Sequence, residues 1–258
     1  MKLIILAAGQ GTRLRPLTDD RPKCLVEVGG KSILDRLMSV AREVGLTDIV
    51  LVGGYRADAL RKYGHPVVIN NRYAETNMVH SLFCAADHFG KEFVLSYGDI
   101  FYQADILRRV AEDDASISIA VDEDWQTYWE CRFNNVLDDA ETLRIENNSI
   151  LEIGGKPQST AEIEAQYLGL LAFRGEGVAE LRKAYAIAQE EEAKGHLNLG
   201  RAKSVDSMYV TDLLQGLADR GAVLHPVRVH GGWVEVDSPD DIQLAEQLEA
   251  EGRFEARP

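Results

Sequence analysis

The first 23 residues constrain the fold most strongly, because an apolar run leads directly into a glycine loop and then into cations. Residues 3–8 read Leu-Ile-Ile-Leu-Ala-Ala, which is typical of a buried strand. Gly9 and Gly11 follow at once, and glycine lets a loop adopt positive φ angles and approach a ligand closely. Backbone N–H groups exposed in such a loop bind phosphate oxygens. The pattern predicts a phosphate-binding loop at the carboxyl end of the first strand.

The spacing of this loop excludes two common phosphate-binding motifs. The dinucleotide fingerprint needs a third glycine where this chain has Leu14, and the P-loop needs Gly-Lys-Ser/Thr where residues 14–16 are Leu-Arg-Pro. A glycine turn after a strand is also ordinary in proteins that bind nothing there. Arg13 and Lys23 favour a phosphate site, because guanidinium and ammonium groups bind phosphate oxygens.

The loop resembles the N-terminal signature of nucleotidyltransferases that make nucleoside-diphosphate-activated sugars and alcohols. That signature is a strand, then Ala-Ala-Gly-x-Gly-Thr-Arg, then Pro-Lys, and residues 7–13 and 22–23 reproduce it. The resemblance implies two catalytic residues: Arg13 covering the β- and γ-phosphates of a triphosphate, and Lys23 bridging the α-phosphate and the acceptor's phosphate. The predicted nucleotide-binding residues are Leu6, Ala7, Ala8, Gly9, Gly11, Thr12, Arg13, Gly53, Asn77, Ser81 and Gly98.

Strands and helices alternate along the chain, which predicts an α/β fold with a mixed, mostly parallel sheet and helices on both faces. The resemblance implies a Rossmann-like, GT-A-like nucleotidyltransferase domain. We expect a single domain over residues 1–258, because a chain of this length can bury one large core. Residues 122–165 are rich in aromatic and acidic side chains and contain a predicted hairpin. We expect them to form an inserted acceptor-binding lobe.

Composition narrows the partners of the chain. The formal net charge is −14 and the sequence has no dense basic cluster, so we expect no nucleic-acid partner. The three cysteines lie far apart, as reduced thiols of a cytoplasmic protein do. The first apolar run is too short for a signal peptide, and no stretch approaches transmembrane length. We therefore expect a cytoplasmic protein without membrane insertion; nothing in the sequence indicates an oligomeric state.

Two aspartates each follow a predicted strand, and they are the candidate metal ligands. Asp99 comes after residues 93–97 and Asp237 after residues 233–236. An aspartate at the carboxyl end of a strand is well placed to bind a metal ion, although an isolated one more commonly caps a turn or a helix. The resemblance implies that both hold Mg²⁺. We expect Glu235 to point to the opposite face, which makes it the weaker candidate.

Two further features concern the substrates. Members of the family that use CTP carry Asn-Asn-x-x-Ser-Leu where the base is held, and this chain has Asn77 and Ser81 with Met78 at the second Asn. Aromatic residues lie among acids in residues 122–130, a combination that attracts quaternary ammonium groups. Both features resemble bacterial-type phosphocholine cytidylyltransferases and their relatives that act on 2-aminoethyl- or 2-hydroxyethyl-phosphonate. The predicted acceptor-binding residues are Lys23, Trp129, Glu130 and Lys156.

The predicted reaction is therefore Mg²⁺-dependent transfer of CMP from CTP to a small phospho- or phosphono-alcohol, with release of pyrophosphate. No general base is required, because the second pKa of a phosphate monoester is about 6 and the attacking oxygen is already ionised. Two alternatives stay open: a sugar-1-phosphate nucleotidyltransferase, which shares the loop and both aspartates, and a non-catalytic nucleotide-sensing subunit. Gly155 stands where the sugar enzymes usually carry Glu, which disfavours a hexose phosphate.

Overall fold

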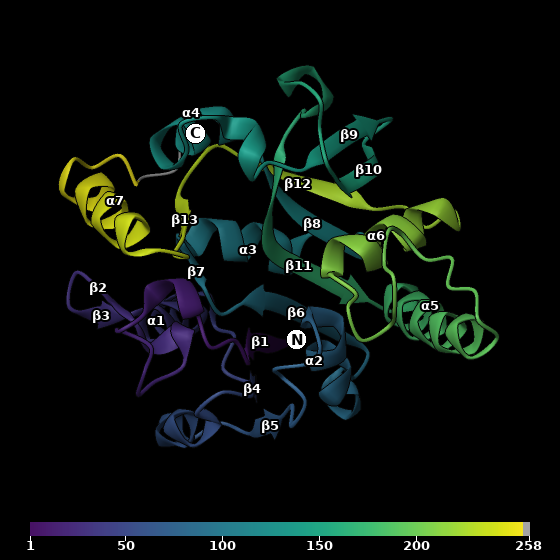
Figure 1. Ribbon diagram of the computed structural model, residues 1–258, viewed down its shortest axis with the longest axis horizontal. Coiled ribbons are helices and arrows are strands. Elements are labelled where there is room, and N and C mark those ends of the chain that lie inside the picture. Colours follow the sequence, from purple (N-terminus) through teal and green to yellow (C-terminus); the bar gives the residue numbers. More distant parts are fainter. Residues whose placement is uncertain (255–258) are drawn as a thin grey trace.

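The computed structural model describes residues 1–254 and shows a seven-stranded sheet with helices on both faces (Figure 1). The strand order is β12-β8-β11-β6-β1-β4-β5. Strand β11 is antiparallel to both of its neighbours, and the other neighbouring pairs are parallel. The predicted mixed, mostly parallel α/β fold is confirmed. The seven strands are β1 (Lys2–Ala7), β4 (Ile49–Gly53), β5 (Val67–Ile69), β6 (Glu92–Tyr97), β8 (Ile117–Asp122), β11 (Gln166–Arg174) and β12 (His225–Val229).

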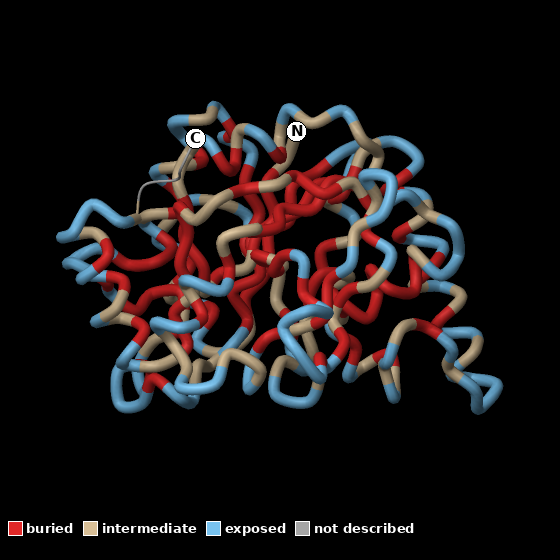
Figure 2. Tube along the Cα trace, turned by 90° about the horizontal axis from the view of Figure 1, so that it is seen from above, coloured by how far each residue is buried: buried red, intermediate tan, exposed pale blue. Residues whose placement is uncertain are grey.

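The central strands are apolar along their whole length because both faces of the sheet are covered. Helices α1 (Ile33–Val44) and α3 (Ala104–Glu112) bury their apolar sides in one hydrophobic cluster. The second cluster is formed with α2 (Met78–Cys84), α5 (Glu176–Ala193) and α6 (Val210–Asp219). Figure 2 shows that buried residues run through the middle of the molecule and exposed residues form the outer turns. No helix within residues 1–254 is both long and apolar enough to cross a membrane.

Helix α7 (Pro239–Ala250) begins at a cap that leaves Asp237 available to the cleft. The Ser238 hydroxyl accepts a hydrogen bond from the backbone N–H of Asp241 at 3.3 Å. The Asp241 carboxylate accepts hydrogen bonds from the N–H groups of Asp237 at 3.0 Å and Ser238 at 2.8 Å. Ser238 and Asp241 thus form a reciprocal capping box. The alternative that Asp237 itself caps this helix is therefore wrong.

A short two-stranded ribbon was only half predicted. Strand β13 (Trp233–Glu235) was expected, but its partner β7 (Ile100–Tyr102) was not. The two strands pair antiparallel, with Glu235 opposite Ile100. The N–H of Val236 donates to the carbonyl oxygen of Asp99 at 2.9 Å. This ribbon is the reason that two segments about 140 residues apart in the chain meet at one point.

The segment 122–165, expected as an inserted lobe, leaves the main sheet after β8 and returns to it at β11. Asp122 itself is the last residue of β8, so the expected boundary is one residue early. The hairpin of residues 142–155 packs on α6. Helix α4 (Trp125–Arg132) packs on α7. That the segment covers the acceptor stays a prediction. Its elements are α4 (Trp125–Arg132), η5 (Val136–Asp138), β9 (Thr142–Glu146), β10 (Ser149–Gly155) and η6 (Thr160–Glu162).

The remaining short elements surround the ends of the strands. They are the 3-10 helices η1 (Thr12–Leu14), η2 (Lys23–Leu25), η3 (Ala57–Tyr63) and η4 (Ala86–His88), and the small hairpin of β2 (Glu27–Val28) and β3 (Lys31–Ser32). Helix α1 follows this hairpin, with Ser32 as its N-cap and Gly45 as its C-cap.

Candidate active site

The glycine loop after β1 holds Lys23 in place. Gly11 has a φ of 69°, and a Cβ at this position would lie 2.9 Å from Cγ of Lys23. The backbone conformation and the close approach of the lysine stem therefore both require glycine. The Thr18 hydroxyl donates to the carbonyl oxygen of Gly11 at 2.8 Å and fixes the far side of the loop. The loop thus delivers an ammonium group to the end of the sheet.

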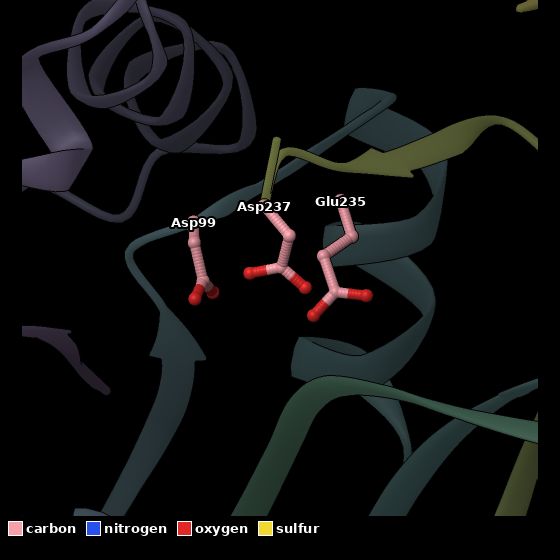
Figure 3. A group of neighbouring side chains, drawn as sticks. All are labelled: Asp99, Glu235 and Asp237. Atoms are coloured by element: carbon pink, nitrogen blue, oxygen red, sulfur yellow. The ribbon is translucent and has the colours of Figure 1, made fainter. Parts of the chain in front are cut away.

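Three carboxyl groups lie together next to the ammonium group of Lys23. Asp99 follows β6, and Glu235 and Asp237 lie at the end of the β7–β13 ribbon, so that one oxygen of each lies within 4.8 Å of the others. Figure 3 shows the Asp237 carboxyl group between those of Asp99 and Glu235. The sequence predicted the convergence of Asp99 and Asp237 but placed Glu235 on the opposite face, which is a correction. Residues two apart in an extended segment share a face, so Glu235 and Asp237 point the same way.

Two cations neutralise this group. The Lys23 ammonium donates to Oδ2 of Asp99 at 2.8 Å and also bonds Oδ1 of Asp237. Nη2 of Arg13 lies 2.9 Å from the same Asp237 oxygen. Lys23 is almost covered, whereas 65% of the Arg13 side chain is exposed. The two residues predicted to be catalytic are thus placed at one point, with Arg13 on the solvent side.

The pKa values of Asp237 and Glu235 are shifted in opposite directions. Burial would raise the pKa of Asp237, but the Lys23 ammonium, with help from Arg13 and Arg132, holds that pKa below its ordinary value. Burial and the neighbouring Asp237 charge raise the pKa of Glu235 to about 7, against the pull of Arg132. Burial alone would lower the pKa of Lys23, but Asp99 and Asp237 raise it, so the lysine is charged at neutral pH.

Arg132 is a central residue of the site that the sequence analysis missed. Its side chain is 1% exposed, and it contacts Glu235 at 2.7 Å, Asp241 at 2.9 Å and Asp237 at 3.5 Å. It reaches these carboxylates from the end of α4, a helix that was not predicted. Arg132 therefore holds the Glu235 and Asp237 carboxylates in place and joins them to the cap of α7.

We expect Arg132→Met to lower the free energy of unfolding by about 3 kcal/mol, because it leaves buried carboxylates without their cation. The value is at the lower end for a broken buried pair, since Lys23 and Arg13 still neutralise part of the negative charge. Urea unfolding followed by circular dichroism measures the change. Arg132→Lys keeps the charge and is expected to lose less. Equal stability of the Arg132→Met variant and the wild type would show that Arg132 does not hold the carboxylates.

The cluster of three carboxyl groups suits a hard divalent cation. Mg²⁺ takes oxygen ligands, usually one or two carboxylates together with substrate phosphates. Oδ1 of Asp99 is buried and has no hydrogen-bond partner within residues 1–254. An unpaired carboxylate oxygen next to two more carboxylates fits the predicted ion, and the role of Asp99 and Asp237 as its ligands stays a prediction.

Two adjoining cavities open on either side of this group. They share Met78, Tyr97 and Asp99. The smaller one measures about 150 Å³ and is lined by Leu6, Ala8, Gly9, Tyr73, Thr76, Asn77, Met78, Ser81, Tyr97 and Asp99. The larger one measures about 460 Å³ and is lined by Arg13, Lys23, Met78, Tyr97, Asp99, Trp129, Asp139, Glu141, Gln166, Tyr167, Leu168, Gly169, Tyr209, Thr211, Trp233, Glu235 and Asp237.

Five of the predicted nucleotide-binding residues line the smaller cavity, and Arg13 lines the larger one. The five are Leu6, Ala8, Gly9, Asn77 and Ser81. The Ser81 hydroxyl accepts a hydrogen bond from Nδ2 of Asn70 at 2.9 Å, and Oδ1 of Asn77 accepts one from the N–H of Met78 at 2.9 Å. Ala7, Gly11, Thr12, Gly53 and Gly98 line neither cavity. A Cβ on Gly98 would lie 2.5 Å from the carbonyl oxygen of Leu6, so this glycine permits close packing of the strand ends.

Only two of the four predicted acceptor-binding residues lie in the cleft. Lys23 and Trp129 line the larger cavity, but Glu130 and Lys156 do not. Glu130 is exposed on α4 and accepts a hydrogen bond from Gln126 at 2.8 Å, because the helical turn that buries Trp129 points the next residue outward. Lys156 is exposed and donates to the carbonyl oxygens of Leu137 and Asp138. The structure therefore brings neither residue to the cleft, contrary to prediction.

A separate cavity of about 350 Å³ borders α4 and α7. Its buried carboxylate, Asp122, accepts hydrogen bonds from Nε1 of Trp233 at 2.9 Å and from the N–H groups of Gly231 and Asp124. These bonds satisfy the carboxylate within the protein, so we place the chemistry at the two adjoining cavities.

Comparison with known proteins identifies the family of the chain. The family model described as a MobA-like NTP transferase domain matches residues 3–195. A CTP:phosphoglutamine cytidylyltransferase of Campylobacter jejuni is 36% identical over 255 residues, which cover 95% of this chain and 98% of that protein. A choline-phosphate cytidylyltransferase of Streptococcus pneumoniae is 37% identical over 107 residues, which cover 40% of this chain and 47% of that protein. The solved CTP:phosphocholine cytidylyltransferase from Streptococcus pneumoniae superposes with a TM-score of 0.68 at 22% identity, covering 96% of this chain and 98% of that one, and it supports the fold.

Proposed function

The chain belongs to the MobA-like NTP transferase domain family, and from that premise we propose that it transfers CMP from CTP to a small phosphorylated molecule and releases pyrophosphate. The observation that carries the proposal is that two cavities meet at a cation and a group of carboxylates. The identity with a cytidylyltransferase over nearly its whole length supports the choice of CTP.

The two cavities divide the substrates between them. The smaller cavity lies against the start of the glycine loop and suits the cytidine part of the nucleotide. The larger cavity lies beyond Asp99 and contains Lys23 and Arg13, so it suits the acceptor and the phosphates. The α-phosphate then lies at the junction, within reach of the Lys23 ammonium.

The reaction needs positioning and charge neutralisation rather than a base. An ionised oxygen of the acceptor's phosphate attacks the α-phosphorus of CTP, and the bond from that phosphorus to the bridging oxygen of the pyrophosphate breaks. Lys23 donates hydrogen bonds to the α-phosphate oxygens as their negative charge rises, and Arg13 stabilises the pyrophosphate as it leaves. We propose that Asp99 and Asp237 hold Mg²⁺, which supplies charge neutralisation at the phosphates when bound.

The acceptor is a phosphorylated small molecule with a cationic group. The two named relatives act on phosphoglutamine and on choline phosphate, and both acceptors carry such a group. Phosphoglutamine was not among the acceptors expected from the sequence. We propose it as the preferred acceptor, because the match to its cytidylyltransferase covers 95% of this chain, whereas the match to the choline-phosphate enzyme covers 40%.

We expect pyrophosphate release with CTP and phosphoglutamine, and at most slow release with UTP, GTP or dTTP. The assay is a coupled pyrophosphate measurement in the presence of Mg²⁺. Phosphocholine, 2-aminoethylphosphonate, 2-hydroxyethylphosphonate and glucose 1-phosphate serve as alternative acceptors. Faster turnover of glucose 1-phosphate than of every cationic acceptor would overturn the proposal, and no release with any pair would favour a nucleotide-sensing subunit.

A further inference from the structure

We propose that Glu141, with Asp139 beside it, binds a protonated amine of the acceptor, and that the enzyme thereby selects acceptors whose cationic group carries N–H donors over acceptors that carry a trimethylammonium group. The inference rests on the proposed function, because it assigns the part of the larger cavity that the phosphate chemistry does not use. Both carboxylates line that cavity.

The backbone of Glu141 is clamped while its side chain is left without a partner. The N–H of Glu141 donates to Oε1 of Gln166 at 3.1 Å, and Nε2 of Gln166 donates to the carbonyl oxygen of Glu141 at 2.6 Å. Gln166 is buried at the start of β11. Among residues 1–254, no side chain or backbone group donates a hydrogen bond to the Glu141 carboxylate or forms an ion pair with it. The protein therefore fixes an unpaired carboxylate against the cavity.

The surroundings of Glu141 make this arrangement costly in the absence of a cation. Burial, together with the charges of Asp139 and Asp212, raises the pKa of Glu141 to about 7, against the opposing effect of Arg201. A buried carboxylate without a partner lowers stability, and proteins keep such groups mainly at functional sites. A ligand cation at this position removes the penalty.

A second unpaired polar group lies in the wall of the same cavity. The Trp129 side chain is 3% exposed, and its Nε1 has no hydrogen-bond partner within residues 1–254. Buried polar groups without a partner are rare and call for an explanation. An unpaired N–H donor and an unpaired carboxylate on residues that line one cavity complement an amino acid head, which has both an ammonium and a carboxylate group.

Primary ammonium and trimethylammonium groups differ in the hydrogen bonds that they can form with a carboxylate. A primary ammonium has three N–H donors and forms charge-assisted hydrogen bonds with carboxylates. A trimethylammonium group has none, so it depends on aromatic faces and leaves Glu141 without a hydrogen bond. A charged hydrogen bond of this kind is worth about 10- to 100-fold in affinity.

The test compares Glu141→Gln with Glu146→Gln, a matched change at the exposed far end of β9, the strand that begins directly after Glu141. With phosphoglutamine, Glu141→Gln is expected to raise the acceptor KM at least tenfold and to leave the KM for CTP unchanged, while Glu146→Gln behaves as the wild type. The wild type is expected to use phosphoglutamine at least tenfold better than phosphocholine. A Glu141→Gln KM within twofold of the wild type, or better use of phosphocholine, would overturn the inference. Absence of CTP-dependent turnover in the wild type would instead overturn the proposed function.

Thermal unfolding gives a readout that does not depend on turnover. Because the pKa of Glu141 is raised in the folded protein, the wild type loses stability as pH rises through 7, and a neutral glutamine does not. Glu141→Gln is therefore expected to unfold at a higher temperature than the wild type at pH 8, with a smaller difference at pH 5. A lower unfolding temperature at pH 8 would mean that the carboxylate has a structural partner, and the inference would be wrong.

Discussion

Replacing Lys23 by methionine is expected to lower kcat by about 10³-fold while the protein stays folded. The ammonium of Lys23 is the cation that bonds both Asp99 and Asp237, and no other lysine lines either of the adjoining cavities. Methionine keeps the apolar stem that packs against Gly11 and removes only the charge. A donor aimed at charge that develops in the transition state acts on kcat rather than on substrate binding. Pyrophosphate release at saturating CTP and acceptor measures the loss.

Two controls make this result interpretable. Lys62→Met, a similar change at an exposed position in η3, is expected to leave kcat unchanged. Circular dichroism shows whether the Lys23 variant is folded, since its loss also removes a partner from two carboxylates. A folded Lys23→Met variant with wild-type kcat would remove the lysine from the chemistry.

The second large effect is expected at the aspartates. Asp99→Asn and Asp237→Asn are each expected to lower kcat by about 10³-fold or more, because a neutral amide is a weak ligand for a divalent cation. Mn²⁺ binding, measured by electron paramagnetic resonance without substrates, is expected to weaken in both variants. Glu235→Gln is expected to have a smaller effect on Mn²⁺ binding, because Glu235 is held by Arg132 at 2.7 Å.

Comparing Mn²⁺ binding among the three carboxylate variants tests the assignment of the metal ligands most directly. If Glu235→Gln weakened Mn²⁺ binding more than Asp99→Asn did, the assignment of the ligands would be wrong. Unchanged Mn²⁺ binding in all three variants would show that the three carboxylates serve only to position Lys23 and Arg132.

The parts of the site that the sequence predicted depend on local chemistry. The glycine loop, the Ser32 cap and the aspartates that end strands are each specified within a few residues. Local pattern also gave the strand before Asp237. These features predicted the sheet, whereas the pairing of Asp99 with Asp237 was implied by the family resemblance. In the structure, the antiparallel β7–β13 ribbon brings the two aspartates together.

The parts that the sequence analysis missed depend on tertiary pairing. Helix α4 has aromatic residues on several sides, so its sequence lacks a helical period, and Arg132 was not recognised as buried. The partner strand β7 is three residues long and has no pattern of its own. Glu141 looks like any acid just before a strand, and what distinguishes it within residues 1–254 is the clamp by Gln166 on its backbone and the lack of a hydrogen-bond donor to its carboxylate.

Asp241 performs two tasks that are usually separate. It closes the first turn of α7 and it also anchors Arg132 at 2.9 Å. Helix α7 is therefore joined to the reaction centre by the chain, since Asp237 directly precedes its N-cap, and by the ion pair of Asp241 with Arg132, so fraying of its first turn would loosen the guanidinium that orients Glu235 and Asp237. Shortening of this chain from its carboxyl end removes the buried Leu248 and Ala245 before it reaches Asp241, so core packing at the end of α7 is lost before the cap and its ion pair.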